Sequence, residues 1–377
     1  MLIHSPPQTD LGVDAISFEW PMKNYFPLQN SQTKQQLNHA NDDEARCDWE
    51  FNLSAVISSS AGNSDAIGVV EFDDGGGFLA TGGIARKIRI YATETSLKSS
   101  ACDFYICTSA KLSSLKWRPG SASRVIGSGD YDGVVMEYDL ERRVPVFERD
   151  EHGGRRVWAI DYSRWGPSLG ASGSDDGTMQ LWDPRCNRSL TPVRPARSPV
   201  CCVEFNPFGG PLVVAGCADR RVYGYDVRRA VEPVFVMDRH EKAVTYTKFM
   251  DPRTIVSSSV DGSLMMWDAE DSRVIRTYRG HVNTKRFVGL SVWRNGGLLS
   301  CGSENNRVYV YDRRWACPVW VRGLETGPQP CCEPGFVSSV CWRQTGEDRC
   351  MLVVGASDGM LQLFEGQTKS GSYYEMR

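Results

Sequence analysis

The fold of this chain is decided by one stretch, Ser-Gly-Ser-Asp-Asp-Gly-Thr-Met-Gln-Leu-Trp-Asp, at residues 172–183. Its Asp176-Gly177 dipeptide favours a tight turn, and the segments on either side predict the two strands of a β-hairpin. Six other segments share this layout and close on an aromatic residue plus one more, usually Asp. The seven segments end at residues 92, 139, 183, 226, 268, 312 and 365. A period of roughly 43 residues is typical of the four-stranded blades of a propeller.

A second apolar strand precedes each segment and also ends in an aromatic residue. These closing aromatics are Phe72, Trp117, Tyr162, Phe205, Phe249, Trp293 and Trp342. Gly or Pro interrupts every stretch long enough for a helix, so the chain is predicted to be all-β. The alternating segment Trp49–Ile57 should add the outer strand of the last blade and so close the ring. The sequence therefore predicts a seven-bladed β-propeller over residues 46–365.

Two tails flank this predicted ring. Residues 1–45 are rich in Gln, Asn and Asp without periodicity, which predicts a disordered tail with Phe18-Glu19-Trp20 as a candidate linear motif. The N-terminus lacks the basic and apolar regions of a signal peptide. Residues 366–377 are predicted to form a C-terminal tail.

Composition narrows the kinds of partner. The 377 residues carry 43 Lys and Arg against 46 Asp and Glu, a net charge of −3, which argues against broad binding to nucleic acid or anionic lipid. No apolar run is long enough to span a membrane. The 13 cysteines form no C-x-x-C and have no His at zinc-ligand spacing. We therefore expect no metal or cofactor, no nucleic-acid or membrane partner, and a reduced protein of the nucleus and cytosol.

The repeated motifs resemble the WD-repeat family over about residues 46–365. In that family a His ahead of the first strand joins the turn Asp and the blade aromatic in a buried hydrogen-bonded network. The resemblance assigns such structural roles to His152, Asp176, Asp219, His240, Asp261 and His281. Ala85 and Asn305 replace the turn Asp in the first and sixth blades. No nucleophile accompanies the Asp-His pairs, so a catalytic role is not favoured.

One position on the face where the inner strands begin stands out. Four residues before the closing aromatic, six blades carry Gly, Ser, Cys or Thr, and the third carries Trp158. This Trp either plugs the channel or forms the floor of a pocket. The alignment places further aromatic and basic residues on the same face: Lys111, Tyr131, Phe287 and Phe336, with Arg86, Arg156, Arg220 and Lys242. Such a mouth suits a short peptide with acidic and apolar residues.

A closer resemblance sharpens this expectation. Segments 111–117 and 155–164 resemble the propeller of the plant constitutive-photomorphogenesis ubiquitin ligase and its suppressor-of-phytochrome partners. The polar leader followed by residues 47–51 resembles the stand-alone propellers called repressors of UV-B photomorphogenesis. The ligase binds Val-Pro peptides through a Lys, a Tyr, a Trp and a Phe, which match Lys111, Tyr131, Trp158 and Phe287. Arg220 stands where the ligase has His.

The resemblance implies a non-enzymatic negative regulator of UV-B signalling. Such a protein would bind the C-terminal tail and the body of the UV-B photoreceptor and return it to its inactive homodimer, alongside proteins of the ligase pathway. A second surface is Trp182, Asp183 and Arg185, because W-D-x-R resembles the box by which propellers dock the damaged-DNA-binding adaptor of cullin-4 ligases. Residues 225–228 and 311–314 are weaker variants of this box.

Two other classes of function remain open. A general scaffold or histone-tail reader would share the fold, but a reader of basic tails needs an acidic mouth, whereas this mouth is predicted to be basic and aromatic. An enzyme is the least favoured class, because no nucleophile-base group, phosphate loop or metal cluster stands out in the sequence.

Overall fold

The computed structural model of the chain describes residues 48–58, 65–95, 102–166, 169–183, 185, 192–324, 335–344, 346 and 349–369. The predicted tail 1–45 and its Phe18-Glu19-Trp20 motif lie outside the described residues. No helix within the described residues is long and apolar enough to cross a membrane. The nine cysteines among them are free, and no group of three or more His, Cys, Asp or Glu there could hold a metal ion.

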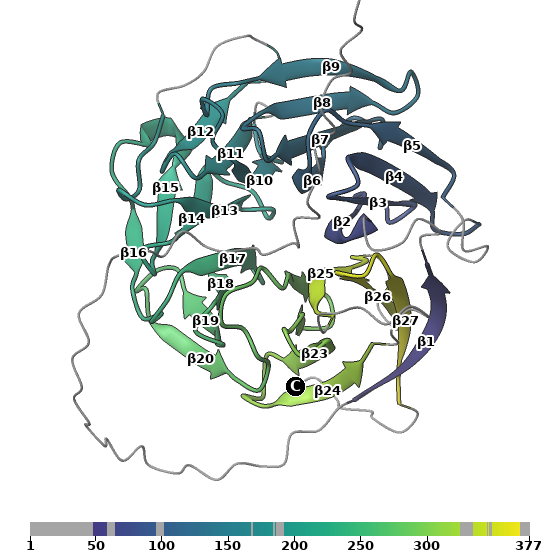
Figure 1. Cartoon of the computed structure of the whole chain (residues 1–377). Helices are drawn as coiled ribbons and strands as arrows, with labels where there is room; N and C mark the ends of the chain where they lie inside the picture. The colour runs from purple at the N-terminus through teal and green to yellow at the C-terminus, as the bar shows by residue number, and fades with distance from the viewer. Residues whose placement is uncertain are drawn as a thin grey trace, which may run out of the picture. The chain divides into compact units, whose positions relative to one another are not determined.

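The described residues form seven antiparallel sheets, which confirms the predicted seven-bladed, all-β propeller (Figure 1). The first blade contains β2 (Ile67–Phe72), β3 (Phe78–Gly83), β4 (Lys87–Ala92) and β5 (Phe104–Cys107). The second contains β6 (Leu112–Trp117), β7 (Val125–Asp130), β8 (Val135–Asp139) and β9 (Val144–Arg149). The third contains β10 (Val157–Tyr162), β11 (Gly170–Ser174) and β12 (Met179–Trp182), with a single bridge from Met179 to Val193 at the fourth position.

The remaining blades continue the same order along the chain. The fourth has β13 (Val200–Phe205), β14 (Leu212–Cys217), β15 (Val222–Asp226) and β16 (Phe235–Met237), with the short helix η2 (Val227–Arg229) before β16. The fifth has β17 (Val244–Phe249), β18 (Thr254–Ser259), β19 (Leu264–Asp268) and β20 (Val274–Tyr278). The sixth has β21 (Leu290–Trp293), β22 (Leu298–Cys301), β23 (Arg307–Asp312) and β24 (Pro318–Gly323). The seventh has β25 (Val337–Trp342), β26 (Arg349–Ala356), β27 (Leu361–Thr368) and β1 (Trp49–Ile57).

The ring closes through β1, as the alternating N-terminal segment predicts. β1 pairs antiparallel with β27 and becomes the outer strand of the seventh blade (Figure 1). Around the channel each inner strand contacts the inner strands of its two neighbours, and β25 contacts β2 to complete the circle. One predicted boundary is wrong: β27 continues to Thr368 instead of ending at residue 365, because Gly366, Gln367 and Thr368 find backbone partners in the nine-residue β1.

Apolar clusters between adjacent sheets hold the blades together. The blade aromatics Trp182, Trp267, Trp293 and Trp342 are among the most deeply buried side chains of the described residues. The first and last blades share the cluster that contains Phe72, Leu79 and Leu363. Burial of these side chains supplies the main favourable free energy of folding. Because the clusters lie between adjacent blades, the stability of each blade depends on its neighbours.

The His and Asp residues of the repeat pair differently from blade to blade. In the fifth blade His240 Nδ1 lies 2.9 Å from Asp261 Oδ2, and Ser257 links His240 Nε2 to the Trp267 indole at 2.7 Å on each side. In the third blade His152 and Asp176 make the same 2.9 Å contact. The indole Nε1 of Trp182, however, has no partner among the described residues.

The fourth and sixth blades use tyrosines in these networks. Asp219 Oδ2 accepts a hydrogen bond from the Tyr223 hydroxyl at 2.5 Å, without a histidine. His281 Nδ1 lies 3.0 Å from the Tyr311 hydroxyl, because the turn residue of that blade is Asn305 and offers no carboxylate. Among the described residues, buried His281 therefore has no acidic hydrogen-bond partner, unlike His240.

Candidate functional site

Two faces of the ring are defined by the direction of the inner strands. The upper face is where these strands begin, and the lower face is where they end at the closing aromatics. The tight turn between the second and third strands of a blade lies on the upper face, since its backbone bonds to the residues that enter the inner strand. Examples are Tyr131 N to Lys111 O, Asp175 N to Arg156 O and Val260 N to Ala243 O, at 3.0 to 3.1 Å.

A β-bulge at the upper end of the inner strands explains the orientation of Trp158. In β10 the pairing register shifts between Val157 and Ala159, which leaves Trp158 as the extra, unpaired residue. Five other inner strands have the same shift, at the equivalent residues Gly68, Ser113, Cys201, Thr245 and Ser338. A bulge redirects the side chain of its extra residue. Where that residue is Ser or Thr, its hydroxyl bonds to a backbone carbonyl, as Ser338 does to Gly355 O at 3.2 Å. Trp158 instead places a large ring at the channel mouth.

The Trp158 ring stacks on the ring of Phe287, which lies on the opposite side of the upper opening. The ring centroids are 4.3 Å apart and the planes differ by 6°. Trp158 belongs to the third blade, while Phe287 precedes the inner strand of the sixth, so the stack bridges the mouth. Tyr246 of the fifth blade packs edge-on against Phe287 at 5.7 Å. We call Trp158, Phe287, Tyr246, Tyr131 and Arg156 the aromatic platform.

Arg156 connects the Tyr131 and Trp158 rings of the platform. Its guanidinium lies 4.0 Å from the Tyr131 ring centroid and 4.5 Å from that of Trp158, in cation–π geometry. Burial raises the pKa of the Tyr131 hydroxyl to about 12, with Arg156 acting against the rise, so the hydroxyl keeps its proton as a hydrogen-bond donor. The Trp158 indole donates to Asp175 Oδ1 at 2.5 Å, which orients the ring. Arg156, one of the basic residues predicted on this face, is thus part of the platform.

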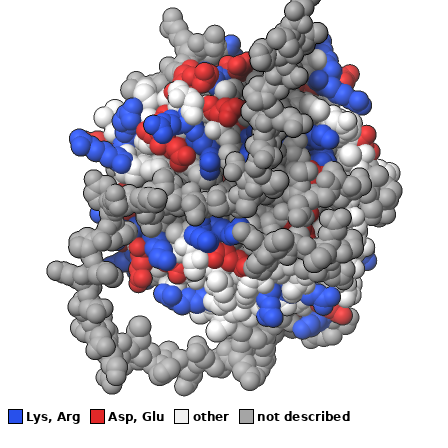
Figure 2. Space-filling model, viewed as in Figure 1, with Lys and Arg blue, Asp and Glu red and all other residues white. Residues whose placement is uncertain are grey.

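Unpaired basic residues surround the platform. Arg86, Lys111, Arg220 and Lys242 are exposed, and their side chains make no ion pair with the described residues. They come from the first, second, fourth and fifth blades. We call Arg86, Arg220 and Lys242 the cationic rim. Figure 2 shows basic and acidic side chains interspersed over the described part of the face drawn there.

Two rim arginines have an uncommon backbone conformation. The turn position after the repeat Asp has positive φ in every blade, and four blades place Gly there. The other three use Arg86 at 54°, Arg220 at 78° and Asn306 at 57°. A long side chain in the left-handed region costs free energy that Gly avoids, and such strain is found mostly at functional sites. The chain therefore keeps arginine at two strained positions beside the platform.

One predicted contact residue does not reach the surface. Phe336 is only 4% exposed, and the Arg286 guanidinium covers its ring at 4.3 Å. The prediction of direct contact with a peptide is therefore wrong for Phe336 as the chain is folded here. The alignment of the repeats predicted this residue at the mouth but could not show that the Arg286 side chain lies over it.

A groove next to the platform extends the candidate site. Asp175, Asp176 and Gly177 form one wall, and the loop 194–199 forms the other. Arg194 and Arg197 are exposed on that loop. These two arginines, together with Tyr246, Asp175 and Arg286, were not predicted from the sequence. A basic loop directly after the third blade was a visible signal for the first two, whereas Tyr246 could be found only from the contact across the mouth.

The predicted adaptor box has a defined geometry. Arg185 Nε lies 2.9 Å from Asp183 Oδ1, and the guanidinium also reaches Oδ2 at 2.6 Å, while Trp182 is fully buried beneath. The Asp226–Arg228 and Asp312–Arg314 pairs repeat this two-oxygen clasp. The three arginines are more than half exposed. Residues 225–228 and 311–314, the weaker variants of the box in sequence, thus present the same Asp-held guanidinium as the W-D-x-R box.

Comparison with known proteins places these features in a family. A model of the WD domain, G-beta repeat, matches residues 143–183, and a model of the Nucleolar protein 10-like N-terminal domain matches residues 165–326. The WD40 β-propeller domain of Doa1 has a similar fold, with a TM-score of 0.67 and 17% identity over 83% of this chain and 96% of that one.

Similar sequences come from Arabidopsis thaliana. E3 ubiquitin-protein ligase COP1 is 33% identical over 80% of this chain and 45% of its own length. WD repeat-containing protein RUP1 is 56% identical over 93% of both chains. WD repeat-containing protein RUP2 is 59% identical over 81% of this chain and 89% of its own length. With this coverage on both sides, the chain belongs to the plant RUP family of WD-repeat proteins.

Proposed function

We propose that this protein is a non-enzymatic negative regulator of UV-B light signalling that binds the UV-B photoreceptor through the upper face. The observation that carries the proposal is the aromatic platform, in which Trp158 and Phe287 stack across the mouth and the cationic rim surrounds them. Aromatic residues and arginine are the side chains that most often dominate the binding free energy of an interface. The similarity to RUP1, RUP2 and COP1 supports a regulator of plant light signalling.

The platform suits the apolar part of a Val-Pro peptide. Stacked rings offer a flat apolar surface, and Tyr131 adds a hydroxyl whose proton stays bound at neutral pH. Lys111 lies beside Tyr131, since Tyr131 N bonds to Lys111 O at 3.0 Å. Acidic residues that flank Val-Pro would meet Lys111 and the groove arginines Arg194 and Arg197. The C-terminal tail of the photoreceptor is the proposed source of this peptide.

The cationic rim supplies the proposed second contact, with the body of the photoreceptor. A tail held on the platform raises the effective concentration of a weaker contact nearby. If the rim contact favours a dimerisation-competent conformation, the protein speeds return of the receptor to its inactive homodimer. The proposed setting is the nucleus and cytosol, in company with proteins of the COP1 ubiquitin-ligase pathway.

Recovery of the photoreceptor dimer in the dark tests this proposal. Arg86→Glu, Arg220→Glu and Lys242→Glu are combined in one variant, which leaves the platform intact. The variant should slow dimer recovery, measured by size exclusion, while still binding the isolated tail peptide. Equal recovery with wild-type and variant protein would reject the two-contact mechanism and leave competition for the tail peptide as the better account.

A second candidate function is docking to the damaged-DNA-binding adaptor of cullin-4 ligases. The specific observation in its favour is the exposed clasp of Arg185 on Asp183, repeated by Arg228 and Arg314. A rigidly held guanidinium loses little conformational entropy when a partner binds it. Co-precipitation of the adaptor with wild-type protein and with Arg185→Ala tests this function. Unchanged co-precipitation would remove Trp182, Asp183 and Arg185 from the docking surface.

A further inference from the structure

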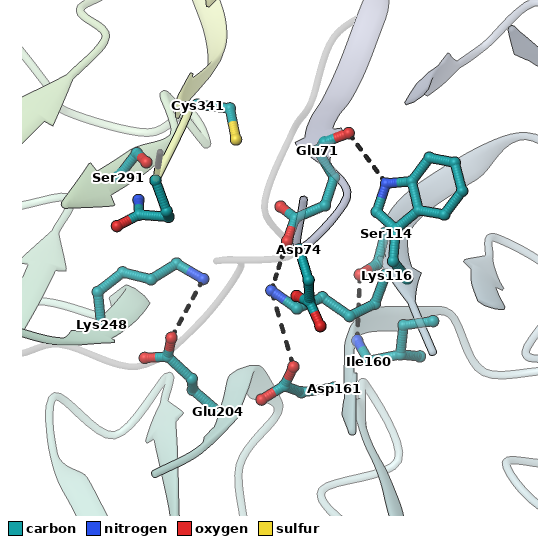
Figure 3. Close-up of polar contacts among 12 residues, drawn as sticks. Glu71, Asp74, Ser114, Lys116, Ile160, Asp161, Glu204, Lys248, Ser291 and Cys341 are labelled. Atoms are coloured by element: carbon teal, nitrogen blue, oxygen red, sulfur yellow. Dashed lines mark hydrogen bonds and ion pairs between the residues drawn. The ribbon is translucent and has the colours of Figure 1, made fainter. Parts of the chain in front are cut away.

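The lower opening of the channel is a cavity of about 310 Å³ that the proposed photoreceptor contacts do not use. Its wall carries a charge in five consecutive blades, at the position just before the closing aromatic of each inner strand. The residues are Glu71, Lys116, Asp161, Glu204 and Lys248. Figure 3 shows Lys116 and Lys248 reaching toward the centre from different strands, with the carboxylates between them.

The carboxylates of this ring are engaged in holding blades together. Asp161 Oδ2 accepts a hydrogen bond from the backbone N of Phe205 at 2.7 Å, and Glu204 Oε2 accepts one from Phe249 N at 2.8 Å. Each acid thereby fixes the closing aromatic of the next blade. Lys116 pairs with Glu71 at 2.5 Å and lies 3.7 Å from Asp161. Lys116 thus has two acids within 4 Å, so this part of the ring has no cation left for a carboxylate from outside.

The other side of the cavity has more cationic groups than acids to pair with them. Lys248 Nζ and Arg294 both face a single oxygen, Glu204 Oε1, at 3.6 and 3.7 Å, which is too long for a hydrogen bond. Lys248 Nζ makes no closer polar contact with the described residues. Both side chains are about a quarter exposed, at 24% and 23%, and line the cavity. Arg294 Nε donates to Phe249 O at 3.1 Å, and its Nη2 shares the distant Glu204 oxygen with Lys248 Nζ. The two cations therefore keep N–H groups that can receive a second carboxylate from outside.

An apolar surface borders these cations. Trp165 follows β10 and is 42% exposed, and Phe208 follows β13 and is 45% exposed. The two loops are neighbours, since a Cβ on Gly209 would lie 3.9 Å from the Trp165 ring. The Arg294 guanidinium lies 5.6 Å from the Phe208 ring centroid and so connects the apolar surface to the cation pair. Exposed large aromatics next to a lined cavity mark a binding surface more often than scattered apolar residues do.

We propose that the lower opening is a second peptide-binding site, whose ligand brings one Asp or Glu side chain to Lys248 and Arg294 and an adjacent apolar side chain to Trp165 and Phe208. A polyanion fits the cavity poorly, because its lining holds five acids, Glu71, Asp73, Asp74, Asp161 and Glu204, against four bases, Lys116, Arg164, Lys248 and Arg294. Because the lining as a whole is one charge negative, a carboxylate can be received only locally, beside the two cations Lys248 and Arg294. The site is distinct from the aromatic platform and lies on the opposite face of the ring.

An array of capped hexapeptides tests the proposal. Each has Glu, Gln or Lys at its centre with Leu, Phe or Trp on one side, and binding to the full chain is measured by fluorescence polarisation. Wild-type protein should prefer Glu-centred over Gln-centred peptides by about tenfold, as expected for a charge-assisted contact. Lys248→Gln should remove this preference, and Trp158→Ala should leave it unchanged. Added polyphosphate should not compete.

Variants at the surface separate binding from folding. Trp165→Ala removes an exposed ring and should weaken the Glu-centred peptides about tenfold, whereas the matched control Tyr105→Ala, exposed on β5, should have no effect. Equal binding of Glu- and Gln-centred peptides, an unchanged preference in Lys248→Gln, or competition by polyphosphate would overturn the proposal. Loss of the preference in Trp158→Ala would show that the peptides bind the platform, and would also overturn it.

Discussion

The two openings of the channel are built from opposite ends of the same inner strands, yet they use side chains in different ways. At the upper opening a bulge residue is Gly, Ser, Cys or Thr in most blades and Trp158 in one, and the cations of the rim form no ion pair with any residue that the structure describes. At the lower opening Asp161 joins the third blade to the fourth, and Glu204 joins the fourth blade to the fifth. The difference indicates that side chains at the upper opening can change to suit a binding partner. The charged side chains of the lower ring, in contrast, are needed for the stability of the fold.

The largest effect is expected from removing an acid of the lower ring. Glu204 is buried, holds Phe249 N, and is the shared partner of Lys248 and Arg294. Glu204→Ala should lower the free energy of unfolding by about 3–5 kcal/mol, because it leaves buried donors and cations uncompensated. Urea titration measures the change. Asp74→Ala, which breaks the half-exposed pair with Arg164 at the same opening, is the control and should cost less than about 1 kcal/mol.

The upper opening should be more sensitive to mild acid through His281, which lies in the segment leading to Phe287. Burial lowers the pKa of His281 to about 4, against about 6.5 in the unfolded chain. Because the unfolded chain binds the proton first, stability is lost as the pH falls from about 6.5 toward 4. The free energy of unfolding should be about 2 kcal/mol smaller at pH 5 than at pH 7.5 from this group. His281→Gln should remove that part of the difference, and an unchanged difference would contradict the assignment.

The strained rim arginines should show opposite effects on stability and binding. Arg86→Gly or Arg220→Gly relieves a positive φ and should raise the free energy of unfolding by up to about 1 kcal/mol, partly offset by the greater freedom of Gly in the unfolded chain. Both variants should lower the affinity for the full-length photoreceptor more than the affinity for its isolated tail peptide. Asn306→Gly, at the equivalent turn of the sixth blade, should change the free energy of unfolding and photoreceptor binding less than the arginine variants do, since Asn tolerates this conformation. Unchanged receptor binding would remove the two arginines from the partner surface.

The smallest effect on stability is expected from Arg185→Ala. The Asp183–Arg185 pair is exposed, so its loss should change the free energy of unfolding by about 0.5 kcal/mol or less. The variant should bind Val-Pro peptides like wild type while losing the adaptor. A large loss of stability would instead indicate that the clasp is needed by the third blade.

The repeat made the architecture predictable, because turn residues and aromatics recur at each blade. It also located Trp158, since one large residue replaced small ones at an aligned position. The stack of Trp158 on Phe287 could not be predicted, because it depends on the width of the closed ring and on two blades distant in sequence. The covering of the Phe336 ring by the Arg286 guanidinium could not be predicted either, because it is a contact between two side chains. The charged ring, in contrast, is visible in the sequence, because Glu, Lys, Asp, Glu and Lys directly precede five successive closing aromatics.

Calorimetric titration of a Val-Pro peptide tests the central claim, that the upper platform is the partner site, most directly. Wild-type protein is compared with Trp158→Ala and with Trp165→Ala, a tryptophan variant at the opposite opening. Trp158→Ala should weaken binding by about 2 kcal/mol or more, as for a desolvated aromatic anchor, and Trp165→Ala should bind like wild type. If Trp158→Ala binds the peptide with wild-type affinity, Trp158 only fills the channel and the platform is not the partner site.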